Sequence, residues 1–165
     1  MSRRSQTRRS ARSISARTTL RLAGCKRRTL HNVGMHTPRI DGVETTTYRV
    51  RARLIEFKFE DDRDIHLVVG VPSAPKKTMI VEFPDPTCPG AKDSPKKARM
   101  ASARSALIAS CGKPPSASSG FRDLRGTATV TGVGFFDIPH GQTGVAPTAI
   151  ELHPVLKFLA ASCSH

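Results

Sequence analysis

Three acidic residues stand where one cation-binding site can form. Asp64 begins an expected strand directly after a turn, Glu82 ends the next expected strand, and Asp85 follows it closely. Hard divalent cations such as Ca²⁺ prefer carboxylate oxygens as ligands, and a further carboxylate can help to activate a water molecule. The sequence therefore predicts a divalent-cation site where these strand ends meet.

Histidines form a second candidate metal site with two other acids. Glu151 and His153 alternate on one face of the expected last strand, and two or three such ligands would suit a transition metal. Spacing alone does not show that they converge, and isolated histidines are usually only hydrogen-bonded. The full candidate set is His66, Asp137, His140, Glu151 and His153.

A row of arginines marks the first expected strand. Arg49, Arg51 and Arg53 alternate with apolar residues, which places the three side chains on one face. A basic strand face can follow a nucleic-acid backbone, although a simply solvated face has the same pattern. We therefore predict nucleic acid or another polyanion as a candidate partner of these arginines.

The elements that position these residues are five strands and a helix. In two of the strands the apolar parity switches, near Leu54 and near Gly132, which predicts bulges of the kind that closed barrels need. An open sheet is the alternative, but bent strands favour closure. The expected strands are Thr45–Glu60, Asp64–Val71, Thr78–Phe83, Thr127–Phe136 and Ala149–Leu156.

One helix is expected between the third and fourth strands. Ser94 is a suitable N-cap, Pro95 fits the first helical position, and Gly112 supplies the stop. Its apolar stripe consists of Met100, Ala103, Leu107, Ile108 and Cys111. This order predicts a mainly β protein, a five-stranded OB-like barrel with one helix between strands three and four.

The acidic and basic phrases resemble those of the thermonuclease (staphylococcal-nuclease-like) family, calcium-dependent phosphodiesterases that are OB-fold barrels. Asp62-Arg63-Asp64-Ile65 is similar to the family's D-G-D-T phrase, and Val81-Glu82-Phe83-Pro84-Asp85 to its V-D-T-P-E phrase. An Arg-Gly pair opens strand four at Arg125, and Lys77 stands where the family has an arginine.

The resemblance implies a role for each matched residue. Asp64 and Glu82 would be metal ligands, Asp85 the base-like residue, and Lys77 and Arg125 the phosphate clamps. The chain departs from the family at Lys77, because lysine lacks the bidentate fork of arginine. The function expected from the resemblance is a phosphodiesterase acting on DNA or RNA that depends on Ca²⁺ or another divalent cation. The alternative is a non-catalytic OB-fold module that binds nucleic acid or another polyanion.

Two further phrases, Asp64-Ile65-His66-Leu67 and Glu151-Leu152-His153-Pro154-Val155, resemble a widespread group of uncharacterised bacterial proteins, many of them exported. Export favours a disulfide, and Cys88 and Cys111 bracket the expected helix. We therefore predict that these two cysteines pair if the domain matures outside the cytoplasm; buried free thiols are the alternative.

The positive charge of the chain is uneven. Of its 27 Lys and Arg residues, 11 lie in residues 1–40, which contain no acid, so most of the net charge of +14 belongs to that segment. Besides disorder, three interpretations of this segment stay open: a polyanion-binding arm, a transit peptide and an export signal. The export signal is suggested by Ser2-Arg3-Arg4 and Leu22-Ala23-Gly24-Cys25. A start codon placed too far upstream would give the same pattern.

The expected domain organisation follows from this composition. We predict a disordered basic arm over residues 1–42, the barrel over residues 43–158 and a flexible tail over residues 159–165. No stretch of the sequence approaches the roughly 20 apolar residues of a membrane-spanning helix. The sequence also lacks a repeat of 20–50 residues, which excludes solenoids and propellers.

Overall fold

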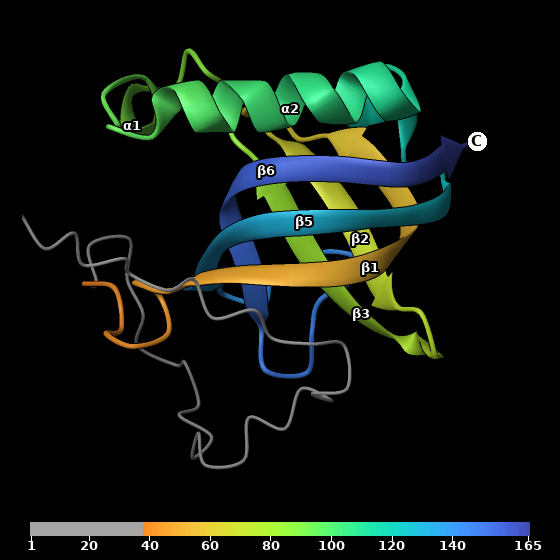
Figure 1. The fold of residues 1–165 in the computed structure, drawn as a ribbon, viewed down its shortest axis with the longest axis horizontal. Coiled ribbons are helices and arrows are strands. Elements are labelled where there is room, and N and C mark those ends of the chain that lie inside the picture. The colour runs from red at the N-terminus through yellow and green to blue at the C-terminus, as the bar shows by residue number, and fades with distance from the viewer. Residues whose placement is uncertain (1–37) are drawn as a thin grey trace, which may run out of the picture.

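The computed structural model describes residues 38–165, so residues 1–37 of the expected arm over residues 1–42 lie outside the described part. The described chain is mainly β and includes one long helix (Figure 1). The strands are β1 (Thr47–Phe59), β2 (Ile65–Val71), β3 (Ala74–Phe83), β4 (Arg122–Asp123), β5 (Arg125–Phe136) and β6 (Ile150–Ser164), and the helical segments are α1 (Pro89–Lys92), α2 (Lys97–Cys111) and the short 3-10 helix η1 (Ala117–Ser119).

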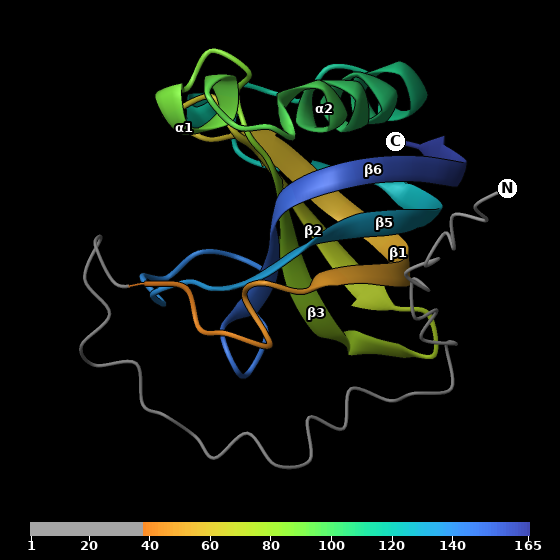
Figure 2. The ribbon, with the colours of Figure 1, turned by 60° about the vertical axis from the view of Figure 1, so that its left-hand side comes forward.

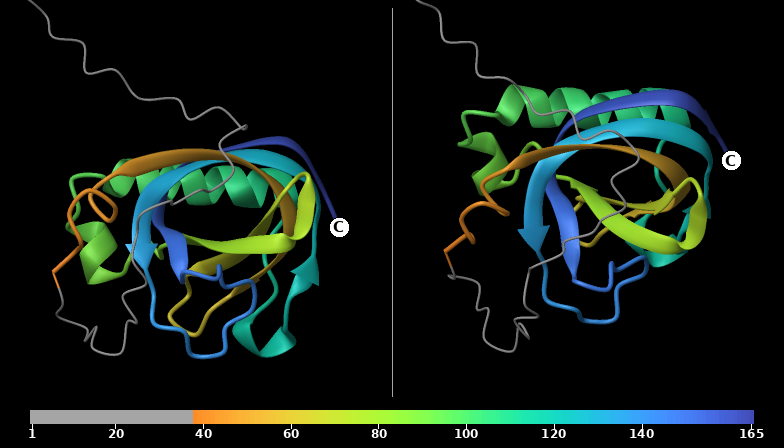
Figure 3. Two further views of the ribbon diagram at one scale, coloured as in Figure 1. Left: turned by 90° about the horizontal axis from the view of Figure 1, so that it is seen from below. Right: turned by 60° about the horizontal axis from the view of Figure 1, so that its bottom comes forward.

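Five of the strands close into a ring. The sheet order is β2-β3-β6-β5-β1, and β1 also pairs with β2, which joins the two ends of the sheet. All of the neighbouring pairs are antiparallel except β3 and β6, which are parallel. Seen from below in Figure 3, the strands curve around a common interior, and α2 lies along the outside next to β6 (Figure 2).

Both predicted parity switches coincide with irregularities in strand pairing. In β1 the register with β2 shifts between Leu54 and Glu56. In β5 the register with β6 shifts on both sides of Gly132. A bulge bends its strand and increases the local twist, and such bends let long strands pair with two neighbours around a ring.

The interior is filled from all five long strands and from α2. Phe57, Phe83 and Phe158 are buried there, and the rings of the last two meet edge to face at 5.8 Å. The helix contributes Ala103, Leu107 and Cys111 to the same cluster, as the helical stripe predicted.

Three boundaries differ from the sequence prediction. The long helix begins at Lys97, because Ser94 and Pro95 form a turn in which the Ser94 carbonyl oxygen accepts the Lys97 N–H. The third strand begins at Ala74, because β2 and β3 form one hairpin. The expected flexible tail is wrong for residues 159–164, since β6 continues pairing with β5 as far as Ser164.

The predicted disulfide is also wrong. Cys111 is bonded to Cys163, and Cys88 is a free, exposed cysteine. The extension of β6 is the physical reason, because it brings Cys163 beside the last turn of α2, with the two Cα atoms 5.3 Å apart. The disulfide thus links the C-terminal end of α2 to the C-terminal end of β6.

Candidate metal centre

The candidate site lies where β2, β3 and β6 meet. In the antiparallel pair β2–β3, His66 is opposite Glu82. In the parallel pair β3–β6, Val81 is opposite Leu152, so the next residues along both strands, Glu82 and His153, are neighbours. Asp64 stands just before β2, at the end of the turn that follows β1.

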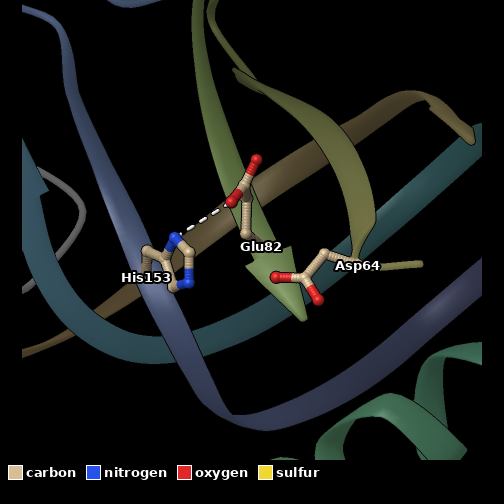
Figure 4. Close-up of side chains that lie close together, drawn as sticks. All are labelled: Asp64, Glu82 and His153. Atoms are coloured by element: carbon tan, nitrogen blue, oxygen red, sulfur yellow. Dashed lines mark ion pairs between the residues drawn. The ribbon is translucent and has the colours of Figure 1, made fainter. Parts of the chain in front are cut away.

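Asp64, Glu82 and His153 point toward one another (Figure 4). One ligand atom from each side chain lies within 4.8 Å of those of the other two, and the described residues contain no other such group of histidine, cysteine and acidic side chains. Asp64 is buried, and the other two are half-buried. We call these three residues the triad; it is a group that could hold a metal ion.

The triad combines the two candidate sites of the sequence prediction. Asp64 and Glu82 come from the expected acidic site, and His153 comes from the expected histidine site. The parallel pairing of β3 with β6 is responsible, because it joins strands that are far apart in the sequence.

His153 lies between two carboxylates. Its Nδ1 is 2.9 Å from Glu82 Oε2 and 3.4 Å from Glu151 Oε1. Burial opposes the charged imidazolium, but the hydrogen bonds to the two glutamates outweigh it and raise the pKa of His153 to about 10. The raised pKa favours the charged imidazolium at neutral pH, and a metal ion bound through this nitrogen would have to displace its proton, since imidazole binds metals in its neutral form.

The two glutamates respond differently to this proton. Burial raises the pKa of Glu151 to about 7, despite its hydrogen bond to His153. Burial also opposes ionisation of Glu82, but the closer hydrogen bond and the charge of His153 hold the pKa of that carboxyl below its usual value. The nearer carboxylate forms the ion pair, and the farther one is poised to carry a proton near neutral pH.

Asp64 is fixed by the loop that follows β3. Its Oδ1 accepts the backbone N–H of Asp85 at 2.7 Å. Burial raises the pKa of Asp64, and the hydrogen bond from the Asp85 amide only partly offsets it. Asp85 is thus adjacent to the triad, but its own carboxylate turns to Thr87 and to Arg63, 3.1 Å away.

His66 supports the triad from β2 and does not join it. Its Nε2 donates to the Thr143 carbonyl oxygen at 2.9 Å, while its Nδ1 lies 3.1 Å from Glu60 and 3.7 Å from the free oxygen of Glu82. Both ring nitrogens of this buried histidine thus face protein partners, and Glu60 is the closer of the two carboxylates.

Both expected phosphate clamps lie elsewhere in the fold. Lys77 is exposed on β3, and the strand continues without a break to Glu82, so about 16 Å separates the two residues at ~3.3 Å per residue. Arg125 pairs with Ser164 at the far end of β6, whereas His153 lies near the start of that strand. The length of β3 thus separates Lys77 from the triad, and the length of β6 separates Arg125 from it. The phrase similarity had implied that both residues lie beside the metal ligands.

The other predicted site residues do not belong to the triad. Asp137 and His140 form a pair of their own at 3.8 Å, and His140 is mostly exposed. Arg49, Arg51 and Arg53 lie on β1 opposite threonines of β5, as the alternation predicted.

Sequence reasoning missed three arginines near the site. Arg39 donates to the carbonyl oxygen of His153 at 3.4 Å and lies over the ring of Phe135, which contacts the His153 ring edge to face. Arg63 pairs with Asp85 beside the triad, and Arg104 donates to the carbonyl oxygen of Arg63 at 2.6 Å. Only Arg63 carried a sequence signal, because it lies inside the Asp62-Arg63-Asp64-Ile65 phrase.

No protein-family model, no curated protein and no solved structure matches the chain. The likeness to thermonucleases therefore stays a prediction from short phrases. None of the helices in the described part of the chain is long and apolar enough to cross a membrane.

Proposed function

We propose that the protein is a divalent-metal-dependent phosphodiesterase acting on DNA or RNA, with Asp64, Glu82 and His153 as its metal ligands. The observation that carries the proposal is the convergence of these three side chains within 4.8 Å, from β3, from β6 and from the residue just before β2. The closed ring with a helix between its third and fourth long strands adds support, because it has the order of an OB-like barrel, the fold of the family that the phrases resemble.

The ligand set favours particular metals. Calcium binds oxygen ligands and needs six to eight of them, whereas the triad offers two carboxylates and one imidazole nitrogen. Imidazole suits transition metals, and carboxylates also suit Mn²⁺. Among divalent cations we therefore expect Mn²⁺ or Zn²⁺ to bind more tightly than Ca²⁺.

A divalent cation bound here would lower the pKa of a water molecule and stabilise negative charge on a phosphate. The chain's own residues would complete the site. Asp64 and Glu82 would supply anionic ligands, and the Asp85 amide would hold Asp64 in place. Glu151, 3.4 Å from the same Nδ1 of His153 that faces Glu82, would place a further carboxylate beside the site.

We assign the phosphate contact to Arg63 in place of the two expected clamps. Its side chain is 69% exposed, and its guanidinium is held 3.1 Å from Asp85 by an ion pair. Its Nη2 also donates to Thr87 at 2.8 Å, and Asp85 is hydrogen-bonded to Asp64 through its backbone, so the guanidinium is fixed near the metal ligands. Arg63→Gln should raise KM for a nucleic-acid substrate more than Lys77→Gln does.

The test uses the purified full chain with Mn²⁺, Zn²⁺ or Ca²⁺ and a labelled single-stranded DNA. Calorimetric titration measures metal binding, and gel analysis measures cleavage. Glu82→Gln should weaken metal binding at least tenfold and abolish cleavage, as should a chelator. Asp93→Asn is the matched control, because it neutralises an exposed carboxylate at the end of α1 and should change neither readout.

Two results would overturn the proposal. Absence of cleavage with all three metals, under conditions where they bind, would leave a metal-binding protein that is not a phosphodiesterase. Cleavage that persists in Glu82→Gln would mean that the reaction takes place at another site.

A further inference from the structure

A basic surface lies on the outside of the ring, over β1, β5 and β6. These strands are adjacent, and their register aligns Arg49 with Thr131 and Lys157, and Arg51 with Thr129 and Leu159. We call this surface the basic sheet face. Its members are Arg49, Arg51, Arg53, Thr127, Thr129, Thr131, Lys157 and Leu159.

Burial shows that this surface faces outward. The alternate residues Ala52, Ala128 and Phe158 are buried in the interior of the ring. Arg49 and Lys157, by contrast, are exposed. Successive side chains of a strand point to opposite sides of the sheet, so the arginine row and its neighbours turn away from the core.

The basic sheet face is uniform in the sign of its charge. It carries four cationic side chains and no acidic one. Among the described residues, no ion pair involves Arg49, Arg51 or Lys157. A shallow hollow of about 100 Å³ lies between Arg49 and Lys157, and two threonines form part of its lining. Such a surface attracts a polyanion.

The curvature of the basic rows favours a single strand. Alternate residues of a β-strand are about 6.8 Å apart, which separates Arg49 from Arg51 along β1. The strands curve around the ring (Figure 3), and a flexible single strand can follow such a curved row of cations, whereas a duplex resists bending over about 150 base pairs. The threonine hydroxyls between the basic rows can donate to the phosphate oxygens.

We propose that the basic sheet face binds the phosphodiester backbone of single-stranded nucleic acid. The face has no aromatic side chain, and base stacking needs such platforms, so binding is independent of base sequence. Its only large apolar member is Leu159, which is 48% exposed. This binding goes beyond the proposed cleavage, because it uses neither the triad nor a metal ion.

The experiment is fluorescence anisotropy of labelled oligo(dT), longer than ~16 nucleotides, with the full chain in the presence of a chelator. The test variant is Arg49→Gln/Arg51→Gln/Lys157→Gln. The control is Lys96→Gln/Lys97→Gln/Arg99→Gln, which removes three exposed charges near the start of α2. All of these side chains are exposed, and circular dichroism checks that each variant is folded.

The measured quantity is the slope of log K against log salt concentration. Each phosphate contact to a single strand contributes about 0.7 to this slope. The test variant should therefore lose about 2 from the slope, while the control should lose much less. Residues 1–37 are the same in both variants, so any contribution from them cancels in the comparison.

Three results would overturn the proposal. The two variants can lose the same slope, which would mean that only net charge matters. Wild type can bind a duplex of equal length more tightly than the single strand, or it can bind anionic phospholipid vesicles in preference to oligo(dT). Glu82→Gln should bind oligo(dT) like wild type, so loss of the proposed catalysis and loss of this binding are separate outcomes.

Discussion

Reducing the Cys111–Cys163 disulfide should strongly destabilise the fold. The bridge closes a loop with a sequence separation of 52 residues, which runs from the end of α2 and contains η1, β4, β5 and nearly all of β6. In the loop-entropy description, a cross-link of that span removes unfolded-state entropy worth about 4 kcal/mol at 25 °C. Marginal stabilities of roughly 5–15 kcal/mol are usual for domains, so this loss is a large share of the total.

The assay is urea denaturation of the full chain with and without a reductant, followed by circular dichroism. The reduced protein should unfold at a clearly lower midpoint, and Cys163→Ser should match it without reductant. Cys88→Ser is the control, because Cys88 is exposed and free, and its midpoint should equal that of wild type. A reduced protein within about 1 kcal/mol of the oxidised one would refute the reasoning, since the entropic term alone exceeds that value.

Three further predictions concern single positions. Gly126→Ala should destabilise the fold by about 1–3 kcal/mol, because Gly126 has φ +122° and a Cβ there would meet the backbone of the opposite strand. The control is Gly90→Ala, which places its Cβ in open space and should leave the stability unchanged. Equal denaturation midpoints for the two variants would contradict this prediction. Stability should fall as pH rises from 6.5 toward 9, because the pKa of His153 is raised from 6.5 to about 10 and the stabilisation from its charged form is complete only below 6.5. His153→Gln should flatten that slope, and an unchanged slope would show that other groups cause it. Arg104→Gln should cost about 2 kcal/mol, because it loses two charge-assisted hydrogen bonds to backbone carbonyl oxygens at 2.6 Å; a Tm shift no larger than that of an exposed lysine variant would count against it.

The sequence by itself determined the strands, their irregularities and the helical stripe. Alternation of apolar side chains is a local property, so the parity switches at Leu54 and Gly132 were visible before any pairing was known. For the same reason the arginine row of β1 could be placed on one face. Boundaries were less certain, because the weakly apolar end of β6 is held by pairing with β5 and by a disulfide.

The tertiary structure alone decided which candidate residues meet. Sequence spacing identified Asp64 and Glu82 as one site and His153 as part of another, and the parallel pairing of β3 with β6 made them a single triad. The same long-range geometry left Lys77 and Arg125 away from the triad. The sequence shows directly which side chains can bind a metal ion. Whether those side chains converge depends on pairing between strands that are distant in the chain, and packing of the whole ring sets that pairing.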